Sequence, residues 1–363
     1  MRRLLLTFLF LSAFLSLKAQ QVHPEFQVRA DAFFLNSEFD ASGNKLATSQ
    51  TLGAVRATPY VGLRFGKNHR LMAGFSALQH FGTPGKGPQL EAALWYRYDK
   101  RNFTLAAGIF PRATLKGAYS TAVVSDEINL LDAHLEGFLL QWHPGQSHYE
   151  IALDWNGKYG AGRREQFNVI TSGYSPVTPW LALGWEGMFH HLACSEEAID
   201  VVDDHILHPY VKADAAPFTV LEELSLQAGL LSGMQRDRYT EEKARFPLGV
   251  NLTLTAMKWG FGLRNQFYYG NSQAPLYTEL DYTGKPFGPQ LYMRSSFWQV
   301  CTEGATSGYL DRADLFWQKK LGQYVSLAVQ FRFFFGQGGY VGCQQLFHAS
   351  VDLDKITFKH KKV

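Results

Sequence analysis

The chain contains little cysteine, little net charge and, beyond its N-terminus, no long apolar run. Its three cysteines, Cys194, Cys301 and Cys343, are too few and too uneven in number for the disulfide framework of a small secreted domain. We expect free thiols, with one bridge between two loops as the alternative. A formal net charge of +3 is too small to indicate a nucleic acid as partner. No later stretch reaches the roughly 18 apolar residues of a membrane-spanning helix.

Motifs for nucleophilic and nucleotide chemistry are also absent. The sequence has neither the Gly-x-Ser-x-Gly elbow of serine hydrolases nor the glycine-rich phosphate loop that ends in Gly-Lys-Ser/Thr. The glycine-rich segment 336–339 leads into a strand-like run, so we predict a tight loop there. We therefore expect no cofactor and no enzymatic activity. An enzyme at the outer rim, built on Ser195, Asp203, Asp204 or His205, is the alternative.

The first 19 residues have the composition of an export signal. Arg2 and Arg3 precede an apolar stretch over 4–17, and the small residue Ala19 stands before the expected cleavage site. This order of residues is typical of a cleaved secretory signal peptide, with a retained membrane anchor as the alternative. We assign residues 1–19 to the signal peptide and residues 20–363 to a single domain, because no linker or sharp repeat divides them.

The remaining sequence is rich in aromatic residues and in strict alternation. Segment 248–256 (LGVNLTLTA) alternates apolar with small or polar residues, which is the period of a β-strand with two different faces. The same pattern is clear at 26–34, 90–98, 103–109, 149–156, 261–268 and 325–335. We predict that aromatic residues near strand ends form the girdles of a membrane barrel: Trp155, Trp180, Trp185, Trp259, Trp317 and Tyr324.

Short and long connections alternate between the predicted strands. The short turns are 66–68, 99–102, 144–147, 175–179, 257–260 and 320–324, and the long connections lie near 37–50, 113–133, 192–204, 233–244 and 271–308. Bacterial barrels keep short turns in the periplasm and long loops outside, so we predict 271–308 as one outer loop. An open sheet edge in lipid is too costly. We therefore predict an all-β fold, a closed antiparallel transmembrane β-barrel of 16 strands. A barrel of 18 strands and a soluble β-sandwich are the alternatives, and the best helical candidate is a short segment at 195–202.

In these features the chain resembles the Gram-negative outer-membrane β-barrel proteins, porin-like in size. Segments 108–112 (GIFPR), 154–157 (DWNG) and 309–317 (YLDRADLFW) are similar to segments of uncharacterised barrels of this class. Such barrels often end on an aromatic residue that the assembly machinery recognises, whereas here Phe358 is followed by a short basic tail. The resemblance implies an outer-membrane location.

Charged residues of the predicted strands fall opposite the apolar face. A Lys or Arg that faces lipid near mid-bilayer costs roughly 2–4 kcal/mol. We therefore predict that the lumen is lined by Arg29, Arg97, Arg264, Arg312, Arg332, Asp31, Glu91, Asp154 and Asp314. Long loops that fold inward would add Asp126, Glu127 and Asp132, or Glu279 and Asp281. A basic wall facing an acidic loop would select solutes by charge and dipole; hydrated, paired charges without selectivity are the alternative.

A second polar cluster lies at 190–208. It holds His190, His191, Cys194, His205 and His208, residue types that ligate metals. Adjacent histidines on a strand point to opposite faces, and no spacing matches a known metal site. We expect no metal there.

The function that we expect from the sequence is diffusion of small hydrophilic solutes across the outer membrane, through a water-filled lumen. Loops 113–133 and 271–308 would narrow this lumen, and the arginines would tune its charge preference. A plugged barrel with a binding or structural role is the second interpretation. The expected partners are outer-membrane lipid, small hydrophilic solutes and the assembly machinery, with homo-oligomerisation left open and no nucleic acid.

Overall fold

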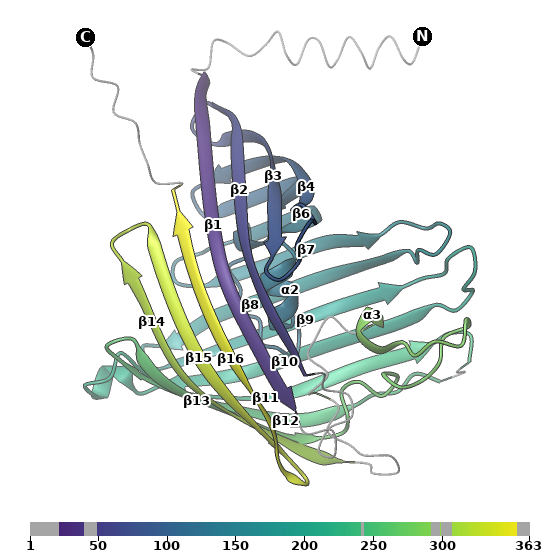
Figure 1. The fold of residues 1–363 in the computed structure, drawn as a ribbon. Helices are drawn as coiled ribbons and strands as arrows, with labels where there is room; N and C mark the ends of the chain where they lie inside the picture. Colours follow the sequence, from purple (N-terminus) through teal and green to yellow (C-terminus); the bar gives the residue numbers. More distant parts are fainter. Residues whose placement is uncertain (1–21, 40–48, 241–242, 292–297, 299–306, 354–363) are drawn as a thin grey trace, which may run out of the picture.

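Sixteen antiparallel strands close into one barrel, in which β1 pairs with both β2 and β16. The structure is a computed structural model that describes residues 22–39, 49–240, 243–291, 298 and 307–353. Strand β1 begins at Val22 and strand β16 finishes at Asp352, at the same end of the barrel (Figure 1). The predicted closed all-β barrel and its count of 16 strands are confirmed. The expected signal peptide, Cys301 and Phe358 lie outside the described residues.

The strands follow one another around the wall in sequence order. They are β1 (Val22–Phe39), β2 (Gln50–Phe65), β3 (His69–His80), β4 (Gln89–Lys100), β5 (Phe103–Pro111), β6 (His134–Trp142), β7 (His148–Gly157), β8 (Gln166–Thr178), β9 (Leu181–Leu192), β10 (Val202–Asp214), β11 (Glu223–Asp237), β12 (Leu248–Lys258), β13 (Phe261–Gly270), β14 (Gly308–Leu321), β15 (Val325–Gly336) and β16 (Gly339–Asp352). Short helices are η1 (Arg112–Thr114), α2 (Asp126–Leu131), η2 (Ala216–Phe218) and α3 (Gly288–Leu291). None of the described helices is long and apolar enough to cross a membrane.

The wall has an apolar outer face and a more polar inner face. Phe34 is 43% exposed while its neighbours Phe33 and Leu35 are buried. In β12 the exposed Leu252 and Leu254 alternate with inward polar residues such as Asn251. So wide an exposed apolar belt is stable only in lipid. The closed sheet leaves no unpaired strand edge within that belt.

The lengths of the connections identify the two ends of the barrel. At the end where β1 begins and β16 finishes, the turns at 66–68, 101–102 and 259–260 are short. At the opposite end, β13 finishes at Gly270 and β14 begins at Gly308, so the prediction of one long loop there is confirmed. The predicted tight loop at 336–339 is also confirmed, because only two residues separate β15 from β16.

The prediction of a helix at 195–202 is wrong. The hydroxyl of Ser195 accepts hydrogen bonds from the backbone N–H groups of Glu197 and Ala198, which closes a turn, and β10 begins at Val202. A helix forms instead at α2. Its N-cap is Ser125, whose side chain accepts from the N–H of Ile128, and two acidic residues occupy its first turn.

The lumen is partly filled by two inward-folded loops, the first of which carries α2 inside the ring of strands (Figure 1). In the loop 112–133, Ala122 and Val123 are fully buried within the largest apolar cluster. In the segment 271–291, Leu276, Phe287 and Leu291 pack with Leu192 and Val202 of the wall. A barrel of this width holds water unless loops enter it, so these two segments set the shape of the interior.

Candidate functional site: a constriction at helix α2

Wall carboxylates hold the first half of loop 112–133 deep in the lumen. Glu150 of β7 accepts hydrogen bonds from the N–H groups of Lys116 (3.0 Å) and Gly117 (2.6 Å) and from the hydroxyl of Tyr119 (2.7 Å). Glu186 of β9 accepts from the N–H of Ser120. Hydrogen bonds to carboxylates are stronger than neutral ones, so each contact fixes the loop firmly.

An ionic network fixes the N-terminal end of α2 to the opposite wall. Arg332 of β15 pairs with Asp126, and Arg312 donates to the hydroxyl of Thr121 over 2.8 Å. Asp314 lies 3.1 Å from Arg312 and supports it from behind. Burial alone would raise the pKa of Asp126. The positive charge and hydrogen bond of Arg332, together with the positive charge of Arg312, instead hold the pKa of Asp126 below its usual value.

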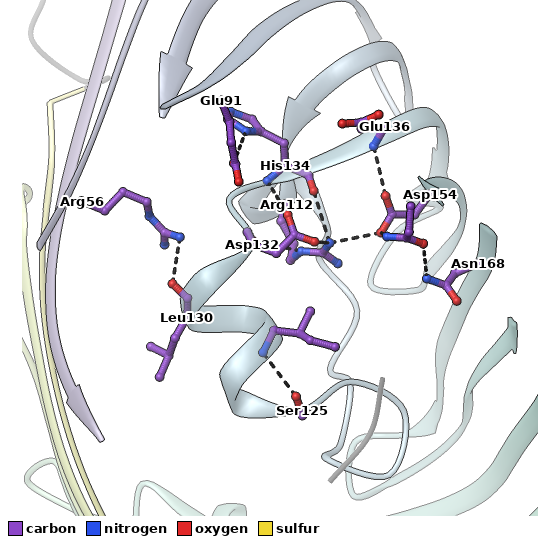
Figure 2. Close-up of polar contacts among 12 residues, drawn as sticks. Arg56, Glu91, Arg112, Ser125, Leu130, Asp132, His134, Glu136, Asp154 and Asn168 are labelled. Carbon is purple, nitrogen blue, oxygen red and sulfur yellow. Dashed lines mark hydrogen bonds and ion pairs between the residues drawn. The ribbon is translucent and has the colours of Figure 1, made fainter. Parts of the chain in front are cut away.

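Two arginines hold the C-terminal end of α2. Arg56 of β2 donates to the carbonyl of Leu130 over 2.9 Å, and Arg112 pairs with Asp132 and with Asp154 of β7. Figure 2 shows Arg56 reaching α2 from one side and Arg112 from the other. Burial raises the pKa of Asp132 despite the opposing charge of Arg112.

Two cavities meet at this end of the helix. The inner cavity has a volume of about 420 Å³, and its lining includes Arg29, Arg56, Arg70, Arg97 and Arg112. The outer cavity has a volume of about 410 Å³, and its lining includes Glu91, Glu127 and Asp132. Asp132 lines both cavities. The partition between them is therefore the end of α2 and its two arginines.

His134 connects the two sides of this partition. One ring nitrogen, Nε2, lies 2.9 Å from the hydroxyl of Tyr60, which lines the inner cavity. The other, Nδ1, lies 3.4 Å from a carboxylate oxygen of Glu91, which lines the outer cavity. Arg112 also donates to the backbone carbonyl of His134, so charged groups of both cavities border one residue (Figure 2).

The structure divides the lumen charges predicted from the sequence into five groups. Arg29, Arg97 and Asp31 line the inner cavity, and Glu91 lines the outer one. Asp154 lies behind Arg112. Arg312, Arg332 and Asp314 anchor α2. Arg264 lines neither cavity, and its guanidinium lies 5.3 Å from the ring of Phe316.

Sequence reasoning missed Arg56, Arg70, Arg112 and His134. Arg56 carried a usable signal, because Arg56 and Thr58 alternate in the sequence with the apolar Val55, Ala57 and Pro59, and the structure buries Arg56 and Thr58. Arg112 and His134 carried none, because their positions depend on how loop 112–133 turns back into the lumen. The sequence does predict the inward fold of this loop, and its Asp126, Glu127 and Asp132 are all at the constriction or its anchor.

The histidine cluster at 190–208 resolves into separate pairs. His190 contacts Asn168, His191 contacts Asp203, and His208 contacts Glu186. Within the described part of the chain, no three side chains of His, Cys, Asp or Glu are grouped as a metal site. Cys194 and Cys343 are free thiols.

Comparison with solved structures gives the same fold. Pseudomonas aeruginosa OpdL matches with a TM-score of 0.54 at 12% identity, over 91% of this chain and 99% of that one. A loop-deleted OmpT, an outer membrane protein of Vibrio cholerae, matches with a TM-score of 0.54 at 8% identity, over 91% and 99%. OprD, an outer membrane protein of Pseudomonas aeruginosa, matches with a TM-score of 0.51 at 9% identity, over 91% and 94%.

Comparison of the sequence gives a family as well as a fold. No curated protein matches the chain. The family model described as lipid A 3'-O-deacylase-type matches residues 17–338, a span that includes the first fifteen strands, loop 112–133 and the anchors of α2. Because the match covers most of the sequence, this chain, which folds as an outer-membrane type of barrel, belongs to the lipid A 3'-O-deacylase-type family.

Proposed function

We propose that the protein is a constricted channel for small hydrophilic solutes in the outer membrane. The observation that carries the proposal is the pair of cavities that meet at Asp132, one on each side of α2. A solute would enter the outer cavity, pass the end of α2 and leave through the inner cavity. We further propose that residues 1–19 are a cleaved signal peptide and that residues 20–363 form the barrel domain.

Arginines on the inner side favour anions at that stage of the path. Arg29, Arg70 and Arg97 have side chains that are 34%, 27% and 26% exposed. Their guanidinium groups are therefore available to a passing solute, although each is also paired with a carboxylate. Fixed charge in a narrow lumen selects ions. We therefore propose that the lumen arginines make the channel prefer anions.

Reconstitution of the folded chain into planar bilayers tests the channel. We expect discrete conductance steps smaller than those of wide, unobstructed porins, because α2 narrows the path. Thr58→Arg, on the inner lining, should change ion selectivity, whereas Lys258→Gln, in the strand end remote from α2, should not. A folded barrel that never conducts, even after residues 113–131 are replaced by a short Gly-Ser linker, would contradict the proposal.

Hydrolysis of an acyl ester of an outer-membrane lipid is the second candidate function. It is favoured by the family match and by a His–Asp pair on the lipid-facing side of the outer rim. His191 lies on the same face of β9 as the exposed Phe189, and its Nδ1 is 2.9 Å from Asp203. Asp203 also holds Arg238 and thereby raises the pKa of that guanidinium. Such a pair can activate water as a general base, and Arg238 suits a phosphate group.

Incubation of the purified protein with lipid A tests this second candidate. Mass spectrometry should detect a released fatty acid, and His191→Gln should abolish its release. Asp204→Asn is a matched control, because Asp204 is the neighbour of Asp203 but is fully buried on the inner face. Absence of release by the folded protein, or release that persists in His191→Gln, would exclude this pair as an active site.

A further inference from the structure

Opposite charges are separated along the path through the constriction. In the inner cavity the lining includes five arginines against the three carboxylates of Asp31, Asp132 and Asp352, and the side chain of Asp31 is 1% exposed while that of Arg29 is 34% exposed. In the outer cavity the side chain of Glu91 is 52% exposed, and Glu127 and Asp132 add two more carboxylates to the lining. The lining of the outer cavity contains neither lysine nor arginine. A solute therefore meets carboxylates without an arginine or lysine on the outer side of α2, and an excess of arginines over carboxylates on the inner side.

Arg56 and Arg112 each keep an unused hydrogen-bond donor at this boundary. Their side chains are 9% and 7% exposed, and Arg56 Nε and Arg112 Nη1 have no hydrogen-bond partner. An unpaired buried donor is unfavourable, and guanidinium groups bind carboxylates in a bidentate manner. Since both arginines line the inner cavity, a small rotation of either side chain would present these donors to a carboxylate there.

We propose that the constriction is a binding site for small zwitterions, that is, amino-acid-like solutes. The carboxylate would bind at Arg56 and Arg112, and the ammonium group at Glu91 and Asp132. The two ends are close, because Arg112 Nη2 lies 3.2 Å from the carbonyl of His134 while Glu91 lies 3.4 Å from its ring. This inference rests on the proposed channel and names its class of solute. A simple anion or cation would use only one half of the site.

Calorimetric titration of the folded full chain in detergent tests the site without relying on conductance. Three probes of matched length are 4-aminobutyrate, which is zwitterionic, butyrate, which is anionic, and butylammonium, which is cationic. We expect 4-aminobutyrate to bind at least about tenfold more tightly than either of the others, because only it makes both charge-assisted contacts. Equal affinities, tighter binding of butyrate, or no binding of 4-aminobutyrate would overturn the proposal.

Two pairs of variants assign the ends of the ligand. Glu91→Gln should remove the preference for 4-aminobutyrate over butyrate. Arg56→Gln should remove the preference for 4-aminobutyrate over butylammonium. The controls are Glu196→Gln and Arg163→Gln, which change the same residue types at exposed positions outside both cavities. Should Arg56→Gln fail to fold, as judged by gel mobility without heating, Arg56→Lys retains the charge but loses the bidentate geometry and should weaken binding. A preference that survives in both Glu91→Gln and the Arg56 variant would contradict the site.

Bilayer recordings separate this proposal from the proposed channel. In wild-type channels, 4-aminobutyrate should reduce the ion current at concentrations at which butyrate and butylammonium do not. Conductance without zwitterion preference would leave the channel standing and refute the site. Zwitterion binding to a barrel that does not conduct would refute the channel and leave a binding protein.

Discussion

Gly117 lies where loop 112–133 contacts strands β7 and β8 of the barrel wall, and its lack of a side chain is what allows the approach. A Cβ atom at this position would lie 2.5 Å from Glu150 Oε1 and 2.6 Å from the Cβ of Ser172. We predict that Gly117→Ala displaces the loop at a cost of about 1–3 kcal/mol, the usual range for overpacking. Single-channel recordings should show larger and noisier currents, and proteolysis should cut the loop faster. Gly87→Ala is the control, because a Cβ there meets nothing within 4 Å. Identical currents in the two variants would show that the contact does not hold the loop.

The two aspartates of α2 and its end should respond to pH in opposite ways. The pKa of Asp132 is raised by burial, so it gains its proton first as pH falls. The pKa of Asp126 is lowered by Arg332, so its contribution to stability is present above its unfolded pKa, about 3.9, and is lost only as pH falls through the lower folded pKa. For Asp132 the sign is reversed, because burial disfavours its charged form and acidification relieves this.

We therefore predict that acidification increases anion preference before it releases α2, because the pKa of Asp132 is raised and that of Asp126 is lowered. Protonation of Asp132 removes a negative charge next to Arg112, while the pair Asp126–Arg332 persists. The reversal potential in a salt gradient, measured at neutral and acid pH, reports this change. In Asp132→Asn the pH-dependent shift should be largely lost. A shift of unchanged size in that variant would assign the titration to another group.

Single residues were predictable from the sequence only where the strand period applies. Arg312, Asp314 and Arg332 follow the alternation of β14 and β15, and the structure has all three buried on the inner face. Their partner Asp126 is 206 residues away from Arg332 in sequence. No local pattern could predict that pairing. The pairing shows that Arg312 and Arg332 anchor α2, whereas the sequence predicts that they line the path of the solute.

Loop 112–133 and the segment 271–291 narrow the barrel in different places. The first crosses the lumen between the two cavities, and the second packs on Leu192 and Val202 at the outer ends of β9 and β10. Replacement of residues 113–131 by a short Gly-Ser linker should raise conductance by at least about twofold, because the lumen of a wide barrel is then open to water. Replacement of 275–287 should raise it less. The reverse order would place the constriction in the second loop.

The element that defines the site was the hardest to predict. A helix of six residues has little stability by itself, so α2 exists because Ser125 caps it and because Asp126, Leu130 and Asp132 are held by arginines of the wall. The segment 195–202 has comparable contacts, since Ser195 accepts from the N–H of Ala198 and Arg164 pairs with Asp200, yet it forms a turn, so such contacts do not by themselves make a helix. The strands needed no such help, because their period of two extends over 9 to 18 residues each.

At the scale of the whole molecule, one rule links the sequence, the fold and the membrane. Each strand turns an apolar face to lipid and a polar face to the lumen, so the alternation in the sequence predicts both the barrel and its environment. The same rule does not predict which residues fill the lumen, because the residues of inward-folded loops do not alternate as those of strands do. This is why the architecture was predictable as a whole while the constriction was not.

The last prediction tests that rule on adjacent residues of β12. Leu254 is 45% exposed on the outer face, while its neighbour Thr253 is on the inner face and only partly exposed. Leu254→Arg should destabilise the barrel by roughly 2–4 kcal/mol, since an arginine is placed in lipid near mid-bilayer. Thr253→Arg should fold normally, because its guanidinium faces the lumen, and should shift ion selectivity toward anions. Unfolding in lipid vesicles, followed by gel mobility without heating, measures the first effect, and the reversal potential measures the second. Equal destabilisation by the two substitutions would mean that this strand does not separate lipid from an aqueous interior.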